Sequence, residues 1–171
     1  MGLGMRMIKL PGTISRKRDF LADVAGRFTG DLVFSTGMTS PEYVDWILST
    51  FSGQGRLYLL HTNSAYPTPI EDCNIAVVKG YAELSREHPR IIPGYSSHDE
   101  GWFGSALAVS CGARMVEKHV KLGSSDWVHF DSVALDLSGT EFGEYVAALR
   151  RAEIALGDPD KRVTPSEHHK Y

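Results

Sequence analysis

Short apolar runs alternate along the chain with segments that carry a helical spacing of apolar residues. The runs are short and rich in aliphatic residues, as expected for strands covered on both faces, and they cover Met5–Leu10, Leu32–Thr36, Leu57–Thr62, Ile91–Tyr95 and Met115–Val120. Helix-sized connections between strands favour parallel pairing, because antiparallel hairpins need only short turns. The pattern therefore predicts an α/β fold of five parallel βα units.

Several of the helical segments have recognisable ends. Ser15 is expected to cap a helix that runs to about Gly26, and Ser40 precedes a proline and a glutamate at the start of the next helix. Thr140 is expected to open the last helix and Gly157 to end it. Two further helices are expected at about 74–87 and 104–111.

Counting strands gives a first prediction of the architecture. A doubly wound sheet needs about five strands, whereas a closed barrel needs eight and usually more than ~200 residues. The chain has 171 residues and five expected strands, so counting alone favours the doubly wound sheet. Neither a GxGxxG nor a GxxxxGK[ST] motif is present to support a nucleotide-binding fold.

Composition and charge narrow the class of protein. An apolar share of 42% and a charged share of 23% are ordinary for a globular domain and argue against a disordered chain. The net charge of −3 argues against nucleic acid as a partner. No apolar run approaches the ~18 residues of a membrane span, and the two cysteines form no CxxC pair. The expected setting is cytoplasmic.

Polar residues follow the ends of the expected strands, where ligands of parallel α/β folds bind. A lysine and hydroxyls occur there, at Lys9, Ser35, Ser64 and Ser96. A single serine at such a place is usually only a cap or turn residue. A lysine together with serines on successive strand ends suggests an anion, with phosphate the first candidate.

His98 and His119 lie 21 residues apart at the ends of consecutive expected strands. Neighbouring strands are about 4.8 Å apart, so the two imidazoles could converge on one divalent ion with positions left open for water and substrate. Each could equally be a hydrogen-bonded residue with a structural role. Glu117 shares a strand face with His119, and we expect it to orient a ligand or to pair with a neighbour such as Lys9.

Four segments of the chain resemble the sialic acid synthase (N-acetylneuraminate synthase) family: Leu32–Met38, Leu59–Asp72, Gly94–Gly101 and Gly112–Leu122. The resemblance runs from about Met5 to Glu167. That family condenses phosphoenolpyruvate with an N-acyl-hexosamine to form nonulosonic acids, on a TIM barrel followed by an antifreeze-like domain. The resemblance implies that residues 1–157 are the last five βα units of an incomplete barrel and that 158–171 are a linker-like tail, in place of the doubly wound sheet.

The resemblance also implies roles for individual residues. Phosphate would be held by Lys9, Ser35 and Ser96, with Ser64 close by. The sugar would meet Tyr66 and Asp131. His98 and His119 would bind Mn²⁺ or Mg²⁺, with Glu117 beside them as the third catalytic residue.

The chain departs from the family pattern at three places. Leu10–Thr13 follow the lysine where the family has a glycine or alanine and a serine, and Ser97 stands where the family has an aspartate. The stretch Asp126–Phe130 replaces a glycine-rich segment, which leaves the acceptor sugar open. Three hypotheses remain: a nonulosonic acid synthase, a synthase for a related ulosonic acid, and an inactive fragment or half-barrel subunit that self-associates or needs a partner chain.

Overall fold

The computed structural model describes residues 4–123 and 128–170. Its main sheet has five parallel strands in chain order: β1 (Met7–Leu10), β2 (Asp31–Ser35), β3 (Leu57–His61), β4 (Ile91–Ser97) and β5 (Met115–Lys118). A doubly wound sheet reverses its strand order at a switch point, and this sheet does not. The prediction from strand counting is therefore wrong. The five βα units form an open half-barrel, as the family resemblance implied.

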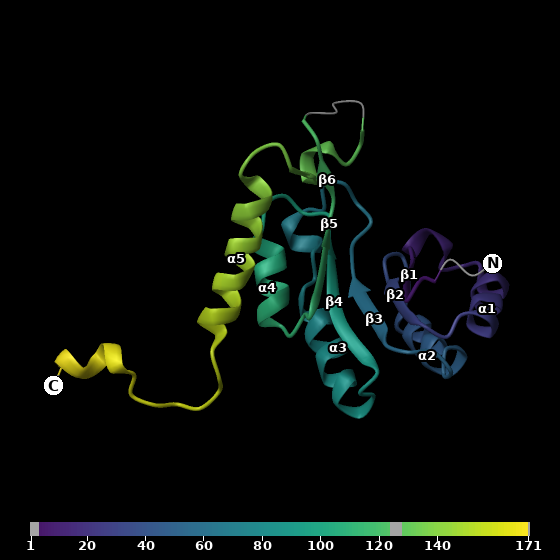
Figure 1. Ribbon diagram of the computed structural model, residues 1–171, viewed down its shortest axis with the longest axis horizontal. Helices are drawn as coiled ribbons and strands as arrows, with labels where there is room; N and C mark the ends of the chain where they lie inside the picture. The colour runs from purple at the N-terminus through teal and green to yellow at the C-terminus, as the bar shows by residue number, and fades with distance from the viewer. Residues whose placement is uncertain (1–3, 124–127, 171) are drawn as a thin grey trace.

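Within the described residues, five α-helices connect and follow the strands: α1 (Arg18–Arg27), α2 (Pro41–Thr50), α3 (Ala76–Glu87), α4 (Phe103–Ser110) and α5 (Glu141–Leu156). Figure 1 shows α1 and α2 beside β1 and β2, and α4 and α5 beyond β4 and β5, so the helices lie along the outside of the sheet. Two short parallel strands follow the main sheet, β6 (Val120–Lys121) and β7 (Leu135–Asp136). The chain after α5 projects away from the rest of the protein (Figure 1).

The helix ends agree with the sequence prediction at three of the four helix boundaries that were assigned to a particular capping residue. Ser40 and Thr140 precede α2 and α5, and Gly157 follows α5 with a φ of 60°, which favours glycine. Ser15 does not cap α1. Gly12–Ile14 form a 3₁₀ turn that Ser15 closes by donating its N–H to the Gly12 carbonyl at 3.0 Å, so the helix begins at Arg18.

The two faces of the sheet differ in what covers them. The outer face forms the main core, in which strand residues such as Phe34 and Leu59 pack with helix residues such as Leu21 and Ile47. The concave face carries a smaller cluster, formed by Val33, Tyr58 and Leu60 with Ile92 and Met115. Side chains of a strand alternate between faces, so the pattern of apolar residues sets both layers. In the described part of the chain no helix is long and apolar enough to cross a membrane.

The sheet is strongly curved. Lys9 lies on β1 and Glu117 on β5, the two edge strands of the sheet, yet the lysine Nζ is 2.6 Å from a carboxylate oxygen of the glutamate. The side chains of two edge strands meet only if the sheet bends around the space between them. This contact across the concave face defines the half-barrel.

Gly94 allows β4 to pass close to its neighbours. A Cβ atom at this position would lie 2.7 Å from the Met115 carbonyl oxygen and would overlap the Leu60 side chain. Both neighbours belong to paired strands, and one of the two contacts is with backbone, so neither can move freely. The close approach at Gly94 is a local condition for the curvature.

We expect Gly94→Ala to lower the free energy of unfolding by about 1–3 kcal/mol, because an added methyl group overpacks the interface between strands. Gly80→Ala is the matched control: a Cβ there has no atom within 4 Å, and alanine in a helix should be neutral or stabilising by about 0.5–1 kcal/mol. Urea unfolding followed by circular dichroism measures both values. Equal midpoints for the two variants would contradict the steric role of Gly94.

Candidate active site

The register of the strands places most of the expected site residues on the concave face. Lys9 pairs with Val33, and Ser96 pairs with Glu117. Because side chains alternate along each strand, Lys9, Ser96 and Glu117 point to the same side as the concave cluster, and Ser35 lies two residues beyond Val33 on that side. All lie toward the carboxyl ends of their strands.

Lys9, Glu117 and Ser96 form one hydrogen-bonded group. The Lys9 ammonium donates to both carboxylate oxygens of Glu117, at 2.7 and 2.6 Å, and the Ser96 hydroxyl donates to one of them at 2.7 Å. Burial raises the pKa of Glu117, but the hydrogen bonds from Lys9 and Ser96 and the lysine charge bring the pKa below its ordinary value. The carboxylate is therefore ionised at neutral pH, and of the two roles expected for Glu117 the structure shows the pairing with Lys9.

His98 is held by the segment that follows β3. Its Nδ1 donates to the Asn63 carbonyl at 2.6 Å, which leaves the lone pair on Nε2. Nε2 accepts a hydrogen bond from the Tyr66 hydroxyl at 2.9 Å, and the two rings stack with centroids 4.1 Å apart. Burial is the main cause that lowers the pKa of His98, so its imidazole is neutral at pH 7.

His119 lies next to His98, with ring centroids 5.4 Å apart. Phe130 stacks on the His119 ring, with centroids 4.6 Å apart and an angle of 14° between the planes. Tyr66 contacts the His119 ring edge-on, with centroids 5.5 Å apart. Burial also lowers the pKa of His119. Two neutral imidazoles therefore stand side by side, with a carboxylate two residues before the second.

The histidine pair fits a divalent ion in one specific respect. Metal-bound histidines usually donate their other ring nitrogen to a carbonyl or carboxylate, and the bond from His98 to Asn63 is of this kind. Among residues 4–123 and 128–170, no group of three or more His, Cys, Asp or Glu side chains is placed to hold a metal ion. Any ion here would have two protein ligands and would need water or substrate for the remainder.

Two of the three hydroxyls expected near phosphate lie at the end of β2 and in the loop after β3. Ser35 is buried at the end of β2. Ser64 lies against Gly37, where a Cβ atom would be 2.6 Å from the serine Oγ, and a Cβ at Gly12 would be 3.1 Å from the Gly37 carbonyl oxygen. The loops after β1, β2 and β3 therefore meet, and glycine is needed where they cross.

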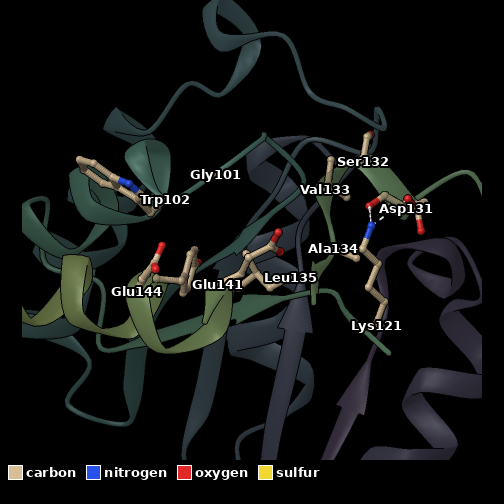
Figure 2. A pocket seen from close by; sticks show the side chains of 11 residues that line it. Gly101, Trp102, Lys121, Asp131, Ser132, Val133, Ala134, Leu135, Glu141 and Glu144 are labelled. Carbon is tan, nitrogen blue, oxygen red and sulfur yellow. Dashed lines mark hydrogen bonds and ion pairs between the residues drawn. The ribbon is translucent and has the colours of Figure 1, made fainter. Parts of the chain in front are cut away.

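Asp131 lies in a different setting. Lys121 donates to its carboxylate at 2.8 Å and to its carbonyl at 3.0 Å. Both residues line a cavity of about 340 Å³ together with Trp102 and Glu141, as Figure 2 shows. None of the other expected site residues lines this cavity. The stretch 126–130 is expected to affect which acceptor sugar is used. Residues 126 and 127 of this stretch lie outside the described part of the chain.

Sequence reasoning missed the residues that hold the two histidines. Asn63 acts through its main-chain carbonyl, which no side-chain pattern reveals. Phe130 and His129 are contacts of His119 and Tyr66, respectively, from a segment that the sequence marked only as unusual. The one available signal was that an aromatic residue beside a histidine follows the last expected strand.

Comparison with known proteins gives consistent matches. The model of the NeuB family matches residues 1–161. The chain is 34% identical over 137 residues to an N-acetylneuraminate-9-phosphate synthase from Mus musculus, which covers 80% of this chain and 37% of that protein. It is 37% identical over 128 residues to a pseudaminic acid synthase from Campylobacter jejuni, which covers 74% of this chain and 36% of that protein.

The fold has a counterpart among solved structures. The N-acetylneuraminic acid (sialic acid) synthetase of Leptospira borgpetersenii superposes with a TM-score of 0.80 at 22% identity, over 98% of this chain and 56% of that chain. This likeness establishes the fold. The chain spans just over a third of the length of the two curated relatives.

Glu117→Gln should lower the pKa of both His98 and His119. The carboxylate charge raises both values, and its loss also leaves the Lys9 charge uncompensated near His119. Imidazole proton shifts followed by NMR across pH 4–8 measure the change. Glu87→Gln, on the exposed side of α3, is the control and should leave both values unchanged. A rise in either pKa in the Glu117 variant would contradict this account of the site.

Proposed function

The chain belongs to the NeuB family, and from this membership we propose that it carries part of the active site of a phosphoenolpyruvate-dependent nonulosonic acid synthase. The reaction joins phosphoenolpyruvate to an N-acyl-hexosamine of the N-acetylmannosamine type and releases phosphate. The arrangement of one ammonium group, one carboxylate and two neutral imidazoles on a single concave face carries this proposal. Such a face offers separate places for an anion and for a divalent ion.

Lys9 and the serine hydroxyls are the anion-binding part. The Lys9 ammonium is held on the concave face by Glu117 and would bind the phosphate of phosphoenolpyruvate together with Ser35 and Ser96. Ser64 lies where the loops after β2 and β3 meet and would contact the same group. Fixing the phosphate holds the enol carbon in a set position relative to the acceptor aldehyde, which lowers the entropic cost of their meeting.

His98 and His119 would hold Mn²⁺ or Mg²⁺, which when bound acts as a Lewis acid on the aldehyde oxygen of the acceptor. The Nε2 atom of His98 carries the lone pair that would bind the ion. The Tyr66 hydroxyl, which donates to this atom in the structure, would then have to turn away. Tyr66 and Asp131 are then the residues we assign to the sugar. Asp131 lines a separate cavity with Trp102, which none of the other assigned residues lines.

The bond changes follow from the two substrates. The enol carbon of phosphoenolpyruvate attacks the aldehyde carbon, so that a carbon–carbon bond forms and positive charge develops at the carbon that bears the phosphate oxygen. Water adds to this carbon, and phosphate then leaves with its bridging oxygen. In this assignment the ionised Glu117 would stabilise the positive charge at this carbon or accept a proton from the added water.

The acceptor sugar has a second candidate. One relative is named for N-acetylneuraminate 9-phosphate and another, of similar identity, for pseudaminic acid. A related nonulosonic or ulosonic acid is therefore the alternative product. A further alternative concerns assembly: β1 and β5 are edge strands of an open sheet, and activity would then require a second copy or a partner chain that pairs with them.

We expect phosphate release from phosphoenolpyruvate to require both Mn²⁺ and an N-acyl-hexosamine, and to fall about a hundredfold or more in His98→Ala and His119→Ala, since changes even in residues behind metal ligands cost 10–100-fold. His88→Ala, an exposed histidine after α3, should keep full activity. The measurement is a coupled phosphate assay with a panel of acceptor sugars and a chelator control.

Full activity in the double histidine variant would contradict the metal assignment. Release with a pseudaminic precursor but not with N-acetylmannosamine would favour the alternative product. No release with any acceptor, under conditions where the chain is folded, would contradict activity of this chain alone and leave the assembly alternative.

A further inference from the structure

A buried polar cluster lies on the outer face of β4 and β5 and has no part in the proposed reaction. It consists of Tyr95, Ser97, Asp99 and Lys118. One carboxylate oxygen of Asp99 accepts hydrogen bonds from the Tyr95 and Ser97 hydroxyls, both at 2.7 Å. The Lys118 ammonium donates to the Ser97 hydroxyl at 2.9 Å and to the main-chain carbonyl of Asp99. Tyr95, Ser97 and Asp99 are each 3% exposed or less.

This outer-face cluster lies directly behind the histidine pair. The last register pair of β4 and β5 is Ser97 with Lys118. His98 and His119 each follow by one residue, so they stand one step beyond the backbone ladder. Because side chains alternate, the histidines point to the concave face and the cluster points outward from the same two strand ends.

Lys118 links the two strand ends past the point where their backbone pairing stops. The main-chain hydrogen bonds of the two histidines go to different neighbours: the carbonyl of His98 accepts from the Thr68 N–H, and that of His119 from the Leu135 N–H. Tyr66 contacts both rings from the concave side. The Ser96–Glu117 bond joins the strands on the concave face, but one register step earlier. The Lys118 bond to the Asp99 carbonyl differs from these bonds, because it runs from β5 to the residue that follows His98.

The chemistry of the cluster makes this link rigid. Lys118 is partly buried, and burial of an ammonium group is costly unless it is paired and hydrogen-bonded, so Lys118 is held where the Ser97 hydroxyl and the Asp99 carbonyl both lie. Helix α4 leaves room for the carboxylate only because position 104 is glycine: a Cβ there would lie 2.5 Å from an oxygen of Asp99. Three elements, β4, β5 and α4, therefore fix one group of polar atoms.

We propose that Lys118 and Asp99 are positioning residues that set the separation of His98 and His119 from the opposite face of the sheet. The effect of this separation on ion binding rests on the proposed function, whereas the separation itself does not. Loss of the Lys118 amine should let the strand ends move relative to each other, and the two rings should lose their fixed spacing.

The test compares Lys118→Met with Lys79→Met in the full 171-residue chain, where Lys79 is an exposed residue of α3. The first readout, without metal, is the nuclear Overhauser effect between ring protons of His98 and His119. The second is Mn²⁺ affinity, from the electron paramagnetic resonance signal of free Mn²⁺. We expect Lys118→Met to lose most of the ring–ring effect and to weaken Mn²⁺ binding about tenfold or more, with Lys79→Met unchanged in both.

An unchanged ring–ring effect in folded Lys118→Met overturns the proposal, even if its urea midpoint falls, because a purely stabilising role would lower the midpoint alone. If Lys118→Met does not fold, Ser97→Ala removes the hydroxyl between Lys118 and Asp99 and is judged by the same ring–ring effect. If His98→Ala leaves Mn²⁺ binding unchanged, the metal assignment fails, and the ring–ring effect still decides the positioning role.

Discussion

The parallel register of five strands in chain order is the constraint on which the site depends. Each strand places alternate side chains on the concave face, and the register carries the same alternation from one strand to the next. Curvature then brings the two edge strands together, so that Lys9 and Glu117 meet although 108 residues separate them. This ion pair is partly exposed and adds little to stability. Its importance lies in where it holds an ammonium group.

The electrostatics of the concave face follow from uneven burial and pairing. Burial keeps the imidazoles of His98 and His119 neutral, while Lys9 and Ser96 keep Glu117 ionised. Neutral nitrogen ligands leave the charge of a bound cation largely intact, and the nearby carboxylate is compensated by its own lysine. Under the proposed function, one face would therefore hold an anion and a cation a few residues apart without either charge cancelling the other.

Much of this arrangement could be predicted from the sequence, because it depends on local periodicity and on residue type at strand ends. The strand positions, the histidine pair and the partner of Glu117 follow from such patterns. The architecture did not follow from counting, since five strands suit two topologies and only their order separates them. The Asn63 carbonyl and the Phe130 ring reach the histidines from loops, whose paths are set by tertiary packing. Asp131 lies with Lys121 for the same reason.

The end of β4 carries polar side chains on both faces of the sheet, and this limits which insertions and deletions the strand can accept. His98 points into the concave face between Ser97 and Asp99, which belong to the outer-face cluster. Removal or insertion of one residue within β4 would exchange the two sets, placing an imidazole among the helices and a carboxylate toward the ligands. Strand length at this point is thus constrained as strictly as composition, and changes in length during evolution should be confined to the loops that follow the strands.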